Sequence, residues 1–194
     1  VVTRADRATP SGRITIVDEN ANGGKPFGVA GVCVSCNSFI KFDKTYTDRD
    51  GYYTMNRQFS SNPRYRLLFN NVKGFSIGFN LILLPASVST LGEASPAGVT
   101  MTVTSDSEEK LFRRCVVNNA AYDYYSRCDK GDMNIMPPPS DLRFWIFGGL
   151  ESGSAVMLHH GAVLQNDYLQ MFLGDYASIL SFFLPDITIG AASR

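Results

Sequence analysis

Thr47-Asp48-Arg49-Asp50-Gly51-Tyr52-Tyr53 is the stretch of sequence that decides how the first half of the chain folds. It separates the β-prone run 39–46 from a second β-prone piece after Gly51. Aspartate side chains bond nearby backbone groups, and glycine accepts a positive φ without steric cost. Two β-prone runs around an Asp-Gly pair predict a β-hairpin, with Asp48, Asp50 and Gly51 as its structural turn residues.

Short runs with a two-residue alternation of polar and apolar side chains recur on both sides of this turn. The expected strands cover residues 12–18, 32–36, 39–46, 52–55, 65–69, 75–79 and 99–104. Residues 81–96 have no clear period and are interpreted as a strand followed by a long loop over 85–98. Short strands divided by turn residues predict an antiparallel β-sandwich.

The hydrophobic period changes from two residues to 3.6 after residue 104. Ser105 and Glu108 have the spacing of a capping box, which predicts the start of a helix. The helix is expected to run to about Arg127, because Gly131 follows it and prolines occupy 137–139. Its expected buried face consists of Leu111, Phe112, Cys115, Val116, Asn119 and Tyr122.

Strands and one more helix are expected in the remainder. The strands cover 142–147, 154–159 and 186–190, and Asn166 or Asp167 caps a helix that ends at Pro185. The apolar stripe of this helix comprises Leu169, Phe172, Leu173, Tyr176, Ile179, Leu180 and Phe183.

These patterns predict a mostly β chain in three parts. Residues 1–11 are a flexible leader, residues 12–104 an antiparallel β-sandwich, and residues 105–194 an α+β segment with two helices on a small mixed sheet. A sheet left unfinished near the end of the chain also predicts self-association through an open edge.

The composition argues against two classes of protein. The 18 basic and 18 acidic residues cancel, whereas a nucleic-acid-binding domain normally gathers a basic excess on one face. The longest apolar run, 75–88, contains Asn80 and Pro85 and is shorter than the roughly 20 residues of a membrane span. The polar residues 1–11 lack the apolar centre of a signal peptide. We therefore expect no nucleic-acid partner and no transmembrane segment.

The four cysteines do not form a recognisable redox or zinc motif. Cys33 and Cys36 lie on an expected strand, where positions i and i+3 point to opposite faces. Cys115 and Cys128 would lie about 20 Å apart on an unbroken helix, too far to pair with each other. Buried or individually paired thiols are the preferred interpretation, and the pairing of the four stays open.

Two pairs of residues have side chains that could bind a metal ion. His159 and His160 are the two histidines and the candidate metal ligands, but neighbours on a strand face opposite sides and cannot bind one ion together without distortion. Asp48 and Asp50 resemble part of a calcium loop, whose twelve-residue pattern and final glutamate are missing. Turn chemistry explains the aspartates, and no cofactor is expected in this chain.

The first half of the chain resembles the carboxypeptidase regulatory-like domains, which are prealbumin-like β-sandwiches common in surface and secreted bacterial proteins. The matching residues are Gly12-x-Ile14, Asp18, Pro26-x-Gly28-Val29-x-Gly31-Val32-x-Val34, Thr47-Asp48-x-Asp50-Gly51-x-Tyr53 and Tyr65-x-Leu67-x-Phe69. The resemblance implies a structural and binding module without catalytic residues of its own.

The second half resembles the beginning of a zincin-like metallopeptidase domain of Bacteroidetes type. The residues that carry this are Cys115, Asn118-Asn119-Ala120, Tyr122-x-Tyr124, Pro138, Leu142-x-Phe144-Trp145-Ile146, Gly153-Ser154-Ala155-x-Met157-Leu158 and Leu184-Pro185-Asp186-Ile187. Zincins bind zinc through His-Glu-x-x-His. No glutamate of this sequence follows a histidine, so the motif is absent.

The two resemblances imply an exported protein that is periplasmic, secreted or on the cell surface. Its β-sandwich would be an accessory domain of a zinc-peptidase-like parent that continues beyond Arg194, or the chain would be a non-catalytic relative. In either case the chain itself is expected to be catalytically silent, and zinc would belong to a longer parent. The alternative is a non-enzymatic cell-surface module that binds protein or glycan.

Overall fold

The computed structural model describes residues 7–78, 86–106, 108–131, 134–147, 156–157 and 185–190. Within these ranges the chain is mostly β, with two sheets and one α-helix, and a short 3-10 turn, η1 (Asn22–Gly24). The second expected helix, over 166–184, lies outside the described residues, as do residues 1–6 of the expected leader.

The smaller sheet is built around β1 (Ser11–Ile16). This strand pairs antiparallel with β2 (Phe27–Gly28) and with β5 (Tyr52–Thr54), and parallel with β9 (Met101–Val103). Ile14 and Ile16 lie on β1 and are fully buried. Thr15 between them is buried too, with its hydroxyl 2.8 Å from that of Thr102, so both faces of β1 are covered at this end of the strand.

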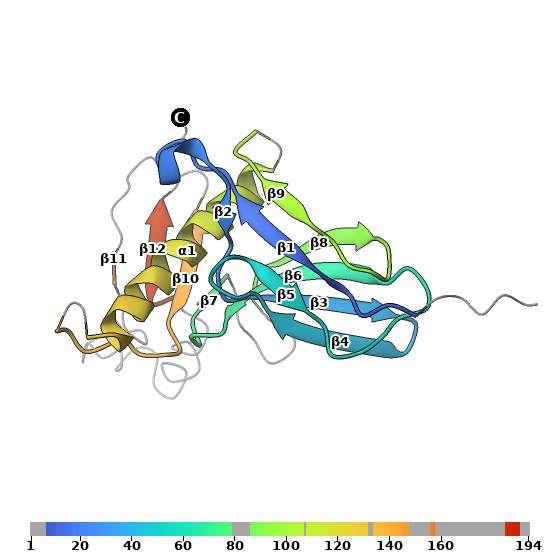
Figure 1. The fold of residues 1–194 in the computed structure, drawn as a ribbon. Coiled ribbons are helices and arrows are strands. Elements are labelled where there is room, and N and C mark those ends of the chain that lie inside the picture. The colour runs from blue at the N-terminus through green and yellow to red at the C-terminus, as the bar shows by residue number, and fades with distance from the viewer. Residues whose placement is uncertain are drawn as a thin grey trace, which may run out of the picture.

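The larger sheet has the strand order β11-β12-β10-β7-β6-β3-β4, and β8 also pairs with β6. Its strands, with their bounds, are β3 (Val32–Ser38), β4 (Lys41–Tyr46), β6 (Arg64–Asn71), β7 (Ser76–Ile77), β8 (Val88–Glu93), β10 (Arg143–Phe147), β11 (Val156–Met157) and β12 (Ile187–Gly190). Figure 1 shows β3 and β4 reaching away from the end of the molecule that holds β10 and β12.

One hydrophobic core joins the two sheets and the helix α1 (Glu109–Asp129). It contains Ile14 of β1, Val34 of β3, Leu67 of β6 and Cys115 of α1. The aromatic ring of Phe75 stacks on Tyr125 of α1 at a centroid distance of 5.4 Å. Burial of these side chains supplies the main driving force for folding.

The predicted hairpin around Gly51 is wrong in its pairing. β4 pairs with β3 in the larger sheet, whereas β5 pairs with β1 in the smaller sheet. Local turn chemistry reverses the chain, but the choice of partner strand depends on the core that each strand helps to cover. The turn therefore carries the chain from one sheet to the other.

The long loop predicted over 85–98 is also wrong, because β8 lies inside it. β8 pairs antiparallel with β6, and its register shifts between Tyr65 and Arg66 of β6. Residues 88–93 are Val-Ser-Thr-Leu-Gly-Glu, which are small or polar at most positions. Hydrogen bonding to the edge of β6, rather than an apolar period, makes this segment a strand.

The helix α1 differs from its prediction at its start and on its buried face. It begins at Glu109, its N-cap Glu108 makes no side-chain capping bond, and the Ser105 hydroxyl donates to the Asp106 carboxylate at 3.2 Å. The predicted capping box is therefore not formed. The buried residues are Leu111, Phe112, Cys115, Asn118, Tyr125 and Cys128, so the face is rotated from the predicted one toward Asn118 and Tyr125.

Contacts between the two halves of the sequence cross residue 104. β10 pairs parallel with β7, with Arg143 opposite Ser76. The Nδ2 of Asn118 donates to the Ala30 carbonyl at 2.8 Å, and that of Asn119 donates to the Gly28 carbonyl at 2.8 Å. These bonds fix α1 to the end of β2 and to the connection between β2 and β3, while the domain boundary near residue 104 stays a prediction.

Candidate functional site

The strand β4 is entered through one turn and left through another, and the two turns have opposite chemistry. The second contains Asp48, Asp50 and Gly51, as expected from the sequence. One oxygen of the Asp48 carboxylate accepts hydrogen bonds from the backbone N–H groups of Asp50 and Tyr52, both at 2.9 Å. This carboxylate is thus engaged in forming the turn.

Gly51 occupies a place that no side chain could share. Its φ is +83°, in the left-handed region that favours glycine. A Cβ at this position would lie 2.1 Å from the backbone oxygen of Ile14. The Gly51 carbonyl in turn accepts the N–H of Ile14 at 2.9 Å, so the turn packs directly against β1.

The first turn, between β3 and β4, consists of Phe39 and Ile40, which we call the β3–β4 tip. Ser38 pairs with Lys41 in the ladder, so these two residues alone reverse the chain. Phe39 has φ +52° and is 97% exposed, and Ile40 is 90% exposed. Glycine, asparagine and aspartate are the residues favoured in two-residue hairpin turns.

The β3–β4 tip is energetically costly in two ways. A positive φ at a side chain other than glycine costs about 1–2 kcal/mol. Two large apolar side chains also remain in water, without the stabilisation that burial would give. Features that folding does not require and that cost stability are candidates for function.

Four hydrogen bonds hold the strand residues beside the tip against the loop over 56–63. The Asp43 carboxylate accepts the backbone N–H groups of Asn56 at 2.7 Å and Arg57 at 2.8 Å. The hydroxyl groups of Ser38 and Ser61 lie 2.7 Å apart. The Lys41 ammonium also donates to the Gln58 carbonyl. The tip is therefore presented on a fixed support.

A second feature is an apolar groove of about 570 Å³ at the other end of the molecule. It lies between α1 and the strands β10 and β12, and its lining includes Val117, Ala121, Phe144 and Ile189. Met136 stands at this groove and is 87% exposed. The groove can take apolar side chains but offers few polar groups for orienting a ligand.

The four cysteines are free thiols and buried. Burial raises the pKa of Cys33 to about 11, and that of Cys36 to about 12. Burial likewise raises the pKa of Cys115 to about 12. A protonated, inaccessible thiol is a poor nucleophile and a poor metal ligand, so these three thiols act as core side chains.

The described part of the chain contains no candidate metal-binding site. No group of three or more His, Cys, Asp or Glu side chains gathers there in a way that could hold an ion. The candidates His159 and His160 lie outside the described residues. The expectation that this chain carries no cofactor stays a prediction.

In the described ranges, no helix combines the length and apolar character needed to cross a membrane.

Comparisons of the chain with protein-family models, curated proteins and solved structures gave no match. Both family resemblances therefore remain expectations.

Sequence reasoning missed Phe39 and Ile40, because both fit a β-strand. It placed the break between strands at Asn37 and Ser38, which are common turn residues. In the fold these two extend β3, where Asn37 accepts a hydrogen bond from the Arg66 guanidinium at 2.8 Å. The turn is thereby displaced by two residues, onto Phe39 and Ile40. No signal in the sequence marks this displacement.

Proposed function

We propose that the chain is a non-enzymatic attachment module that holds its parent protein to a cell surface through the β3–β4 tip. The observation that carries the proposal is the exposure of Phe39 and Ile40 on a strained two-residue turn. A backbone conformation that is costly for its residue, in a turn with two adjacent exposed apolar side chains, supports a functional hypothesis.

The direction in which the tip points also supports attachment. Figure 1 places the far ends of β3 and β4 away from α1, β10 and β12, where the later part of the chain is packed. A contact made at the tip therefore leaves the opposite end free to carry further structure. We propose on the same grounds that the two sheets form a prealbumin-like sandwich used as an accessory domain.

The two resemblances also support a proposal about the parent protein. The parent protein is proposed to be exported and zinc-peptidase-like, with a second helix over 166–184 on the small mixed sheet. The coding region beyond Arg194 tests this directly. A His-Glu-x-x-His motif there supports a peptidase parent, and a stop codon at that point contradicts it while leaving the attachment module intact.

The attachment proposal is tested by sedimentation with bacterial cell envelopes, which contain lipids, proteins and glycans. The test variant is Phe39→Gly combined with Ile40→Ser, which removes the apolar tip and relieves its backbone strain. The matched control is Val72→Ser, because Val72 is 54% exposed and lies in the turn between β6 and β7.

The unmodified chain and the control are expected to sediment with the envelopes, and the tip variant to remain in solution. Equal sedimentation of all three proteins, or of none, would overturn the proposal. Circular dichroism of the variant confirms that any loss of binding comes from a folded protein.

A further inference from the structure

We propose that the component bound by the β3–β4 tip is an anionic lipid surface, with Phe39 and Ile40 inserted among the lipid headgroups and cations around them held by lipid phosphates. This inference rests on the attachment function proposed above, and it names the chemistry of the partner. It does not involve a transmembrane segment, because the tip would lie in the interface.

The first support is the charge around the tip. The segments 36–44, 55–66 and 90–94 meet at this end through the pairing of β4 with β3, β3 with β6, and β6 with β8. They carry five cationic side chains and two carboxylates, an excess of three positive charges. The charged residues are Lys41, Lys44, Arg57, Arg64, Arg66, Asp43 and Glu93.

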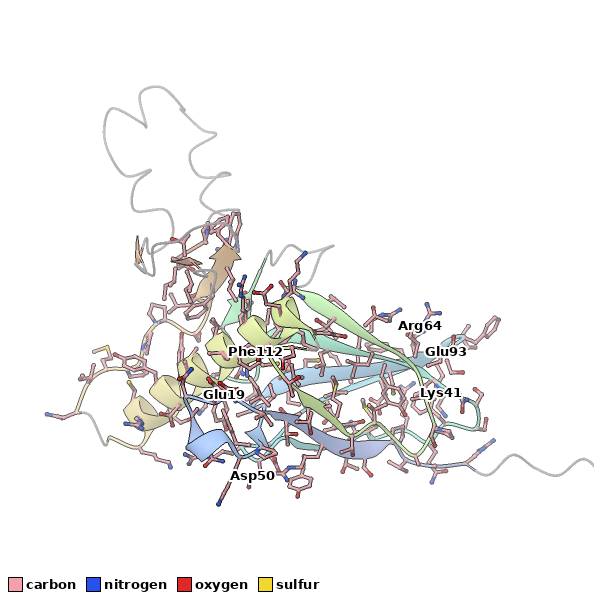
Figure 2. The ribbon with its side chains drawn as sticks, turned by 90° about the horizontal axis from the view of Figure 1, so that it is seen from above. Glu19, Lys41, Asp50, Arg64, Glu93 and Phe112 are labelled. Carbon is pink, nitrogen blue, oxygen red and sulfur yellow. The ribbon has the colours of Figure 1, made fainter. Side chains whose placement is uncertain are left out.

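This excess is local, because the formal charge of the whole chain is zero. Figure 2 shows Lys41, Arg64 and Glu93 gathered at one end of the molecule and Asp50 well apart from them. A surface with a local positive potential beside apolar side chains is attracted to an anionic membrane even when the protein is neutral overall.

The two carboxylates at this end are already engaged. Asp43 is buried and accepts three backbone N–H groups, those of Lys44, Asn56 and Arg57. Glu93 forms a surface ion pair with Arg64 at 3.3 Å. Burial therefore shields Asp43 from a bound lipid phosphate, and the Arg64 guanidinium lies beside Glu93, while Lys44 and Arg57 are exposed.

The shape of the tip favours lipid over protein or glycan. A stable protein interface buries roughly 800 Å² on each partner, far more than a two-residue turn presents. A glycan site needs several convergent hydrogen-bonding groups, whereas the tip offers two apolar side chains. Shallow insertion of apolar groups, assisted by cations whose aliphatic stems lie along the interface, requires neither.

The experiment measures co-sedimentation of the full chain with two kinds of vesicle, one of phosphatidylcholine alone and one of equal parts phosphatidylcholine and phosphatidylglycerol. We expect binding to the anionic vesicles and little to the neutral ones. The Phe39→Gly, Ile40→Ser variant should bind the anionic vesicles at least tenfold more weakly, and Val72→Ser should bind as the unmodified chain does.

The electrostatic part has its own matched pair of variants. Arg57→Glu changes an exposed cation in the 56–63 loop, whose backbone is bonded to Asp43 of β4, and Arg49→Glu makes the same change at the turn beyond β4. Arg57→Glu should lower the vesicle affinity about fivefold or more, and raising the salt concentration should lower the affinity of the unmodified chain. Arg49→Glu should have no comparable effect. Equal losses from both charge changes would contradict the proposed orientation.

Insertion is followed separately with a fluorescent label on Phe39→Cys. The four native cysteines are buried, so an introduced thiol at the tip is labelled selectively. An environment-sensitive dye there should shift to the blue when anionic vesicles are added, whereas the same dye on Val72→Cys should not. The absence of a shift at position 39 in a protein that sediments with vesicles would overturn insertion of the tip.

Failure of the lipid inference can be told apart from failure of the attachment function. If the chain binds cell envelopes through the tip but binds neither kind of vesicle, the attachment module stands and the partner is a protein or a glycan. Equal binding to neutral and anionic vesicles would likewise overturn the anionic-lipid inference.

Discussion

The turn at Asp48–Gly51 and the turn at Phe39–Ile40 lie at the two ends of β4, and they differ in the residue that holds the positive φ and in the burial of their residues. The first has glycine where φ is positive, a carboxylate bonded to two backbone N–H groups, and direct packing on β1. The second has phenylalanine at φ +52° and both side chains in water. Folding explains the residues of the first turn, but those of the second need another explanation.

β3 runs from the buried residues Cys33 and Cys36 to the exposed tip residue Phe39, so thiols at these positions should differ strongly in reactivity. At pH 8 the native thiols Cys33 and Cys36 should react with a disulfide reagent at least a thousandfold more slowly than the introduced thiol of Phe39→Cys. The native thiols react when the protein unfolds, and the unfolded fraction is of order 10⁻³ or less. Thiol titration against time measures both rates.

The buried thiols of Cys33 and Cys36 also make the free energy of unfolding depend on pH, and the direction of that dependence follows from their pKa values. Burial raises the pKa of Cys33 to about 11 and that of Cys36 to about 12, from 9.0. The unfolded chain therefore releases these protons at a lower pH than the folded chain, so the thiols contribute stability that is present below pH 9 and is lost as the pH rises toward 11 and 12. Rapid native-state labelling of Cys33 or Cys36 at pH 8 would contradict their burial.

Gly51→Ala tests the turn that folding requires. The new Cβ would meet the Ile14 oxygen at 2.1 Å, and alanine would be held at φ +83°. We expect a loss of about 3 kcal/mol in the free energy of unfolding, measured by urea denaturation. Gly92→Ala is the control, because Gly92 also has a positive φ but nothing lies within 4 Å of its Cβ position.

Asp48→Ala should have a smaller effect on the same turn. The substitution leaves the backbone N–H groups of Asp50 and Tyr52 without the carboxylate that accepts them, and because both groups are exposed to water the expected cost is about 1 kcal/mol. Asp50→Ala, at the neighbouring exposed carboxylate, should cost less than half of this. An equal loss from both variants would mean that Asp48 does not organise the turn.

The sequence was sufficient for the local features and insufficient for the choice of partners. Asp48 and Gly51 mark a turn whatever surrounds them, because their effects act within four residues. The strand alternation likewise predicted most of the β-strands. The pairing of β5 with β1 rather than with β4 depends on contacts between residues about 40 positions apart, such as Gly12 with Tyr53, which no local pattern encodes.

The candidate site was the part least accessible from the sequence. Phe39 and Ile40 have strand-like side chains, and the turn formers Asn37 and Ser38 lie just before them. Hydrogen bonds from Arg66 to Asn37 and between Ser38 and Ser61 draw those two residues into β3. The exposure of the tip is thus a consequence of tertiary contacts, and the helix face turned toward Asn118 has the same origin.

The most direct test of the central claim is the free energy of unfolding of Phe39→Gly, measured by urea denaturation beside the unmodified chain. Glycine removes about 1–2 kcal/mol of backbone strain and adds about 0.5–1 kcal/mol of conformational entropy to the unfolded state. Because Phe39 is 97% exposed, no packing is lost. We expect a variant at least as stable as the unmodified chain, and a loss of more than about 1 kcal/mol in the free energy of unfolding would show that Phe39 serves the fold instead.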